Sequence, residues 1–287
     1  MFDTPQPARP GTLHIVATPI GNLRDISLRA LDVLRTADLI AAEDTRASQT
    51  LLAAHGIRAR LFALHEHNEA AAATRLVEAL QAGKSVAYIS DAGTPGISDP
   101  GARLVAAARA AGLPVSPIPG ASAVTTTLSV AGMDAPWLFV GFLPARSAAR
   151  HQALRDLAAL PCALVFYEAP HRVEACVGDL LEVLGGEREL LIARELTKRF
   201  EQIHACPLAA APAWLAADEH HRRGEFVLVV SPPAPAAGGE DDVEARRILR
   251  ILLEELPVRQ AAHLAARLSG ARKNALYDLA LSMKKEE

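Results

Sequence analysis

The chain has 287 residues, of which half are apolar and 22% are charged, a balance typical of a folded globular protein. This length suffices for about two domains with separate cores, and no apolar run approaches the ~20 residues that a membrane-spanning helix needs. The net charge of −3 argues against a simple nucleic-acid binder, and a cytoplasmic enzyme is the default expectation.

Charge is unevenly distributed along the chain. From Val243 to the end, nine basic and six acidic residues give a local net charge of +3, whereas the rest of the chain carries −6. A basic appendix on an acidic body points to an anionic partner, although solvated helices alone also produce this distribution.

The first half of the chain alternates between strand and helix patterns. Residues 1–11 contain three prolines and no apolar run, so we expect a disordered tail there and no signal peptide. The expected strands are Leu13–Thr18, Leu39–Glu43, Arg60–Leu64, Ser85–Ser90 and Val115–Pro119. The expected helices begin after the cap Ser27 and cover Glu69–Ala82 and Gly101–Ala111. This alternation predicts a mostly parallel sheet with helices on its faces, in a domain of residues 12–121.

The second half, residues 122–231, repeats the pattern and is expected to form a second α/β domain. Its expected strands are Leu138–Phe142, Ala163–Glu168, Leu190–Glu195 and Glu225–Val230. Its expected helices are Ala148–Leu160, Arg172–Leu184 and Leu208–Asp218. The segment Phe200–His204 alternates between apolar and polar residues, and we interpret it as an added antiparallel strand.

A linker rich in proline, alanine and glycine, residues 232–242, precedes a C-terminal tail of residues 243–287. The tail has three helical patterns, Val243–Leu256, Val258–Leu268 and Lys273–Met283. The last two are joined through Ser269 and Gly270 in a helix-turn-helix-like arrangement. Such a tail either packs or dimerises as a small bundle, or contacts RNA.

Several common motifs are missing. No two glycines are separated by a single residue, which excludes the dinucleotide-binding fingerprint and the glycine-rich loop of many methyltransferases. Val124 replaces the second glycine of a nucleophile elbow at Gly120–Val124, which argues against a serine hydrolase. His65 and His67 are two potential metal ligands, but no third ligand is evident, so we expect no metal. The three cysteines form no paired motif, so we expect no disulfide framework.

Three loops with glycine, proline and small residues follow expected strands. They are Ala17–Asn22, Ser90–Gly101 and Pro119–Ala123. Such loops expose bare backbone, which suits a ligand that lies against main chain at the carboxyl ends of parallel strands. Tight packing turns would explain any one of these loops, but three together favour a binding site.

Charged residues follow three expected strands, at Glu43–Arg46, Tyr167–Arg172 and Arg194–Lys198. Charge next to a core strand costs several kcal/mol unless it is paired or solvated. Structural ion pairs are one explanation and a polar cleft is the other. We favour the cleft, because all three segments lie at the same end of their strands.

Together these segments resemble a known family. Thr18–Asn22, Ala42–Arg46, Ser90–Pro95, Phe166–Arg172, Arg194–Lys198 and Arg272–Tyr277 look like the motifs of the ribosomal RNA small subunit methyltransferase I family, a branch of the tetrapyrrole methylase superfamily. Each motif alone is weak, but their ordered set is specific. The resemblance covers the chain from about Leu13 to the C-terminal tail.

The resemblance implies two α/β domains of the class III methyltransferase type, with S-adenosylmethionine in the cleft between them. It also implies a homodimer, and 2′-O-methylation of a decoding-centre cytidine in the 16S rRNA of the 30S subunit. Carried over by motif, the cofactor-binding residues would be Ala17, Thr18, Pro19, Gly93, Thr94, Ile97, Ser122, Ala123, Tyr167 and Leu196. Ala121 departs from the family, in which many members have a second proline.

Methyl transfer from a sulfonium needs no cofactor beyond the methyl donor. Candidate bases or hydrogen-bond acceptors for the ribose hydroxyl are Glu43, Asp44, Asp91 and Glu168, and the sequence does not rank them. Candidate RNA phosphate ligands are Arg46, Arg172, Arg194 and Lys198. The alternatives are a tetrapyrrole-type small-molecule methylase and a non-catalytic ribosome-binding factor.

Overall fold

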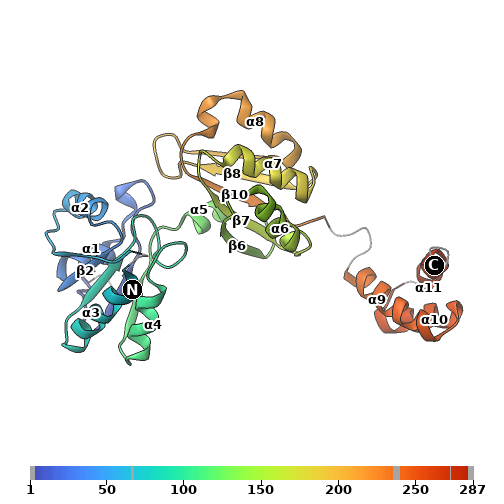
Figure 1. The fold of residues 1–287 in the computed structure, drawn as a ribbon, viewed down its shortest axis with the longest axis horizontal. Coiled ribbons are helices and arrows are strands. Elements are labelled where there is room, and N and C mark those ends of the chain that lie inside the picture. The colour runs from blue at the N-terminus through green and yellow to red at the C-terminus, as the bar shows by residue number, and fades with distance from the viewer. Residues whose placement is uncertain (1–3, 66–67, 235–239, 272, 284–287) are drawn as a thin grey trace. The chain divides into compact units, whose positions relative to one another are not determined.

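The computed structural model describes residues 4–65, 68–234, 240–271 and 273–283, with side chains from Ala245 onward in the first C-terminal helix. Contacts within the chain divide it into two compact units, residues 1–231 and 232–287. Figure 1 labels helices and strands where there is room, with numbers in chain order. Neither unit has a described helix that is long and apolar enough to cross a bilayer.

The first sheet of the larger unit is entirely parallel, with strand order β3-β2-β4-β1-β5. Its strands are β1 (Leu13–Val16), β2 (Leu39–Ala42), β3 (Leu61–Ala63), β4 (Val86–Ile89) and β5 (Val115–Ile118). All residues of the central strand β4 are buried, because helices cover both faces of the sheet. The sequence alternation predicted this arrangement.

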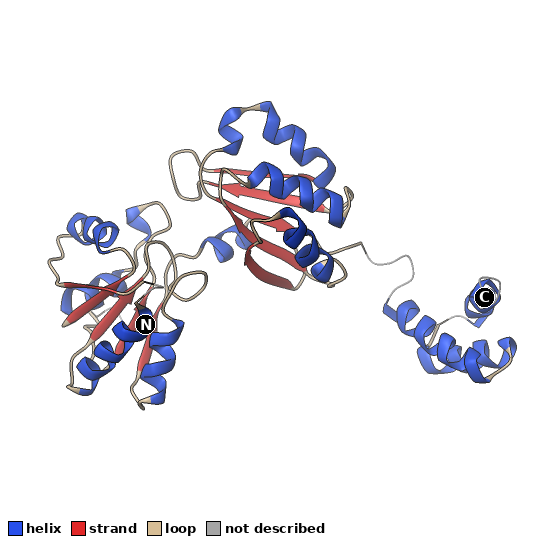
Figure 2. Ribbon diagram, viewed as in Figure 1, coloured by secondary structure: helices blue, strands red, loops and turns tan. Residues whose placement is uncertain are grey.

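Helices cover both faces of this sheet (Figure 2), and each face forms a core with two of them. One face carries α1 (Leu28–Thr36) and α2 (Thr45–Ala54), and the other carries α3 (Glu69–Gln81) and α4 (Ala102–Ala110). The Ser27 side chain caps α1 by accepting a hydrogen bond from the Ala30 N–H, as expected. Helix α2 was not predicted; the Asp44 side chain caps it by accepting from the Arg46 N–H.

The second sheet is mixed, which corrects the expectation of a second mostly parallel sheet. Its strand order is β6-β7-β10-β8-β9, and only β6 and β7 pair in parallel. The strands are β6 (Trp137–Phe142), β7 (Ala163–Glu168), β8 (Glu189–Arg194), β9 (Gln202–Pro207) and β10 (Phe226–Val230). The connection from β8 to β9 is too short for a crossover, so β9 must turn back as an antiparallel edge strand. Strand β10 enters between β7 and β8 and runs antiparallel to both.

Helices α6 (Ser147–Leu157), α7 (Val173–Leu184) and α8 (Ala211–Ala217) cover one face of this sheet. Helix α5 (Ala123–Ser129) packs on the other face through Val124 and Leu128. Since β7 and β8 are both antiparallel to β10, their carboxyl ends lie on the same side. The charged segments Tyr167–Arg172 and Arg194–Lys198, which the sequence places at the ends of these strands, therefore lie on that side. Short 3-10 turns cover Leu23–Asp25, Leu208–Ala210 and Glu219–Arg222.

The N-terminal segment has no regular structure, but its described part is anchored rather than loose. The backbone N–H of Gln6 donates to the Asp32 carboxylate at 3.1 Å, and that of Ala8 donates to the Thr36 hydroxyl at 2.8 Å. Both acceptors lie on α1, so the segment follows this helix.

The smaller unit contains α9 (Glu240–Glu255), α10 (Val258–Ser269) and α11 (Lys273–Met283). Small and apolar side chains from all three helices form its core, among them Leu249, Ala262 and Leu276. Gly270 ends α10 with φ of +75°, a backbone conformation that glycine adopts without a steric penalty. Helices α10 and α11 lie where the sequence predicted them, on either side of Gly270; Arg272 of the expected motif lies outside the described residues.

Candidate active site

A cavity of about 440 Å³ lies in the larger unit, where loops from both sheets meet. Its walls come from the segments that follow β1, β4, β5, β7 and β8, together with the ends of β6 and β10 that lie beside them. The lining residues are Ile20, Ala92, Gly93, Thr94, Ile97, Ser98, Asp99, Ser122, Ala123, Phe142, Tyr167, Glu168, Ala169, Pro170, His171, Leu196, Lys198, Glu225, Phe226 and Val227. The carboxyl ends of parallel strands are the usual binding edge of such sheets.

Most of the expected cofactor residues line this cavity. They are Gly93, Thr94, Ile97, Ser122, Ala123, Tyr167 and Leu196. Ala17, Thr18 and Pro19 are not part of the lining. The backbones of Thr18 and Gly93 instead exchange two hydrogen bonds, with N···O distances of 2.8 and 3.1 Å, so the first turn holds the glycine loop in place.

Gly93 lies where a side chain would be crowded and its backbone strained. Its φ is +83°, and a Cβ atom would meet Ile20 Cγ2 at 3.2 Å and the Ala121 carbonyl oxygen at 3.6 Å. The Thr94 hydroxyl donates to the same Ala121 oxygen at 3.0 Å, which ties this loop to the turn after β5. The loop therefore presents backbone to the cavity in one fixed conformation.

The expected catalytic carboxylates are only partly brought together. Glu168 lines the cavity with a side chain that is 0% exposed, whereas Glu43, Asp44 and Asp91 are not among the lining residues. Asp44 accepts from the Arg46 backbone and side chain, and these bonds hold its pKa below the usual value. Burial raises the pKa of Glu43, and the nearby charges of Asp99 and Asp91 raise it further.

Asp99 is a cavity residue that sequence reasoning missed. Its carboxyl is half-buried in the wall, and burial raises its pKa, with a further contribution from Asp91. Asp99 lies deep in the glycine- and proline-rich loop and does not directly follow a strand. Its position in that loop was a signal that could have identified it.

The expected RNA-binding cations differ in whether their side chains are exposed or already bound to partners within the protein. The Arg172 guanidinium lies 3.2 Å from Glu168 and donates to the Leu143 carbonyl at 2.6 Å. Arg194 is 6% exposed, and its guanidinium donates to the carbonyl oxygens of Arg223 and Phe200. Both are held by internal partners, which disfavours contact with phosphate. Arg46, by contrast, has a side chain that is 92% exposed.

Lys198 is the expected cation that lines the cavity. Its ammonium donates to Glu195 at 2.8 Å and to Glu225 at 2.7 Å, and its side chain is 28% exposed. Although burial lowers the pKa of Lys198, these two carboxylates raise it above the usual value overall. An ammonium has three donor hydrogens, so one remains for a ligand.

The segment that carries Lys198 is strained. Glu195 and Thr197 have φ of 50° and 63°, values that residues other than glycine rarely adopt. The loop packs against Gly21, where a Cβ atom would meet Lys198 Cγ at 2.5 Å. Backbone strain of this kind costs about 1–3 kcal/mol per residue and concentrates at functional sites.

Aromatic side chains form one wall of the cavity. Phe142 and Tyr167 pack edge to face with ring centroids 5.7 Å apart, and burial raises the pKa of the Tyr167 hydroxyl. Phe142 was not predicted as a site residue, although it ends an expected strand. This wall gives the cavity an apolar surface beside its carboxylates.

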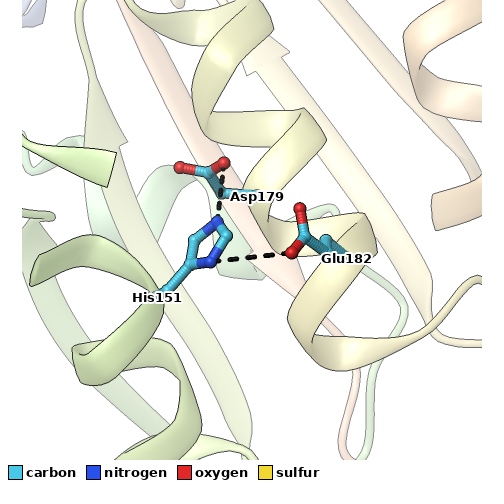
Figure 3. Close-up of side chains that lie close together, drawn as sticks. All are labelled: His151, Asp179 and Glu182. Atoms are coloured by element: carbon cyan, nitrogen blue, oxygen red, sulfur yellow. Dashed lines mark ion pairs between the residues drawn. The ribbon is translucent and has the colours of Figure 1, made fainter. Parts of the chain in front are cut away.

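One cluster of metal-ligand types occurs in the part of the chain that the structure describes: His151, Asp179 and Glu182 on α6 and α7 (Figure 3). None of the three lines the cavity. Asp179 already accepts from the Arg150 guanidinium at 2.6 Å, as well as from Ser147 and His151, so its charge is neutralised by protein. The geometry is that of an ion-pair network. Of the His65 and His67 pair, His67 lies outside the described residues.

The sequence matches two family models. Residues 12–212 match the family Tetrapyrrole (Corrin/Porphyrin) Methylases, and residues 239–284 match the RsmI C-terminal HTH domain. The chain is 50% identical over 273 residues to the ribosomal RNA small subunit methyltransferase I of Pseudomonas aeruginosa, covering 94% of this chain and 97% of that protein. It is 51% identical over 269 residues to the protein of the same name from Xylella fastidiosa, covering 93% and 98%.

Solved structures share the fold at low sequence identity. Uroporphyrin-III C-methyl transferase from Thermus thermophilus, complexed with S-adenyl homocysteine, aligns with a TM-score of 0.54 and 16% identity. The alignment covers 76% of this chain and 96% of that structure. The two α/β sheets therefore have the tetrapyrrole methylase fold that the sequence predicted.

Proposed function

The chain belongs to the ribosomal RNA small subunit methyltransferase I family, and from this premise we propose its reaction. The protein transfers the methyl group of S-adenosylmethionine to the 2′-hydroxyl of a decoding-centre cytidine in 16S rRNA. The observation that carries the proposal is the cavity, because residues from the family's ordered motifs meet there.

The cavity fits S-adenosylmethionine in size and in chemistry. Its volume of about 440 Å³ lies within the range of roughly 300–1,000 Å³ that is usual for small-molecule sites. Bare backbone at Gly93 allows close approach, and the apolar side chains of Ile97 and Leu196 flank it. The Tyr167 ring suits a positively charged sulfonium. We propose that these residues, with Thr94, Ser122 and Ala123, hold the methyl donor.

Alignment is the main contribution of the protein to this reaction. When bound, the donor supplies an activated methyl group on a sulfonium. The Thr18–Gly93 backbone pair and the Thr94–Ala121 bond fix one wall, and the strained segment at Lys198 fixes the opposite one. Holding donor and ribose hydroxyl in line can lower the barrier by roughly 7–11 kcal/mol. Walls that are locked before substrate arrives are what this contribution requires.

Two of the expected cations remain good candidates for RNA phosphates. Lys198 has a donor left over at the cavity, and Arg46 is exposed beside the cap of α2. Phosphate contacts of this kind position the RNA without reading its sequence. We also propose, from the family alone, a homodimer that acts on 30S subunits in the cytoplasm, with RNA contacts from the C-terminal helices.

The test is methyl transfer from labelled S-adenosylmethionine to 30S subunits, to naked 16S rRNA and to a tetrapyrrole. Label in 16S rRNA in either ribosomal substrate supports the proposal, and label only in the tetrapyrrole overturns it. Calorimetry with S-adenosylmethionine is the companion measurement. The proposed enzyme binds the donor and releases or absorbs heat, whereas a purely structural ribosome-binding factor shows no binding.

A further inference from the structure

The loop between β8 and β9, residues 195–201, carries an exposed aromatic ring close to the cavity. Phe200 is 65% exposed. It lies two residues after Lys198, which lines the cavity, so the two Cα atoms are at most about 7 Å apart. One exposed apolar side chain is common on protein surfaces and carries no meaning alone. The rigidity of this loop and the charge beside the ring give this one a function.

Hydrogen bonds across the loop hold the ring in a fixed position. The Thr197 N–H donates to the Glu201 carboxylate at 2.6 Å, and the Glu201 N–H donates to the Lys198 carbonyl at 3.2 Å. From below, the buried Arg194 guanidinium donates to the Phe200 carbonyl at 3.4 Å. Strained backbone persists only where surrounding contacts hold it, and this loop has both the strain and the contacts. A preformed loop loses little conformational entropy when a ligand binds.

A guanidinium without an ion-pair partner lies next to the ring. The Arg199 Cζ atom is 5.5 Å from the centroid of the Phe200 ring. Arg199 is exposed and is in none of the ion pairs formed by the described residues, whereas Lys198 binds two carboxylates. The acid at the end of the loop, Glu201, already accepts from the Thr197 N–H. A free guanidinium suits a phosphate, and an exposed aromatic ring suits the flat face of a nucleic-acid base.

We propose that Phe200 and Arg199 bind the nucleotide next to the one that is methylated. Its base stacks on the Phe200 ring, and its phosphate contacts Arg199. The target ribose must enter the cavity to reach the methyl donor, so the adjoining nucleotide lies at the cavity edge, where Lys198 connects this loop to the lining. Unpaired bases of RNA commonly stack on aromatic side chains in this way, and the contact accepts any base. This inference rests on the proposed methylation of RNA.

The test of the stack is single-turnover methyl transfer at increasing concentrations of 30S subunits that lack the modification. Phe200→Ala should raise the half-saturating concentration about 5- to 150-fold, the effect of losing one base–aromatic stack, with little change in the maximal rate. Phe200→Tyr keeps a flat ring and should resemble the wild type. Phe200→Leu keeps apolar volume without a ring and should resemble Phe200→Ala. The control is Leu28→Ala, which shortens an exposed apolar side chain outside the cavity.

The phosphate contact is tested through salt. Each phosphate contact with a single strand contributes about 0.7 to the slope of log affinity against log salt concentration, so Arg199→Gln should reduce the slope by that amount. Phe200→Ala should leave the slope unchanged. The matched control is Arg155→Gln, which removes an exposed guanidinium on α6, outside the cavity, and should also leave it unchanged.

A Phe200→Leu variant that binds 30S subunits as well as the wild type overturns the inference, because the ring then serves only as apolar volume. So does a Phe200→Ala variant whose only defect is a changed oligomeric state by light scattering, or weaker S-adenosylmethionine binding by calorimetry. An unchanged salt slope in Arg199→Gln overturns the phosphate contact. If the wild-type protein methylates neither 30S subunits nor 16S rRNA, the proposed function fails, and this inference fails with it.

Discussion

The two sheets of the larger unit supply opposite kinds of surface to one cavity. The loops of the first, parallel sheet supply the backbone of Gly93 and the half-buried Asp99 carboxyl, whose hydrogen-bond partner is Ser90. From the second, mixed sheet come an aromatic wall and charged side chains that are already paired, such as Glu168 with Arg172. In the proposed reaction, the loops of the first sheet hold the donor through backbone, while the second sheet provides a wall whose charges are paired with one another.

The largest effect is expected from a side chain introduced at Gly93, where backbone lines the cavity. Gly93→Val places a branched side chain at φ of +83°, against Ile20 and inside the cavity. We expect S-adenosylmethionine binding to be lost by calorimetry while far-UV circular dichroism still shows a folded protein. Gly96→Val is the matched control, because Gly96 has a similar φ of +80° but open space around it. Equal loss of binding in both variants would mean that loop strain, and not cavity contact, is responsible.

The next largest effect is expected from removing one partner of the Glu168–Arg172 ion pair. Arg172→Met leaves the fully buried Glu168 carboxylate without its cation, and such an uncompensated charge costs about 3–5 kcal/mol of unfolding free energy. Urea unfolding measures this loss. Arg222→Met removes a cation from the more exposed pair with Glu174 and should cost about 1 kcal/mol or less. If Arg172→Met is instead as stable as the wild type and binds RNA weakly, Arg172 is a phosphate ligand and does not act as the partner of Glu168.

A smaller effect should appear in the pH dependence of stability. Burial works against ionisation of Glu195, but the hydrogen bonds from Lys198 and from the Glu225 N–H hold its pKa below the usual value. Its contribution is therefore present above the ordinary carboxyl pKa and is lost as pH falls through the lowered one. Glu195→Gln should lose about 1 kcal/mol at neutral pH and flatten the acid-side decline in unfolding free energy. The exposed Glu187 has no such partners among the described contacts, and Glu187→Gln should leave the decline unchanged.

The smallest effect is a gain in stability. Gly178 lies within α7 in the second half of the unit, and a Cβ atom there would meet nothing within 4 Å. Alanine at this helical position should raise the unfolding free energy by about 0.5–1 kcal/mol without changing methyl transfer. We thus expect glycine to be needed at residue 93, in the cavity, and dispensable at residue 178, within helix α7. A loss of activity in Gly178→Ala would show that α7 has a role that its packing does not reveal.

The sequence predicted the first sheet better than the second. Strands separated by helical patterns imply crossovers, and these led directly to the parallel order of the first sheet. The return of β10 between β7 and β8 depends on long-range pairing, which periodicity does not encode. Helix α2 was missed because its polar first turn looked like a continuation of the charged segment at Glu43–Arg46.

The candidate site divides in a similar way. Glycine- and proline-rich loops could be predicted to meet, because carboxyl ends of strands share an edge. The pairing of individual charges could not, since Arg194 and Arg172 find their partners only through the folded second sheet. The sequence did not single out Asp99 because this residue lies within a loop and does not directly follow a strand.

The most direct test of the proposed reaction is identification of the nucleoside that receives the methyl group. 16S rRNA from 30S subunits that lack the modification is incubated with the protein and S-adenosylmethionine carrying a deuterated methyl group, then digested to nucleosides for mass spectrometry. We predict one labelled species, a cytidine with the label on its ribose, placed in the decoding centre by oligonucleotide mapping. Label on a base, or on a nucleoside other than cytidine, would contradict the account.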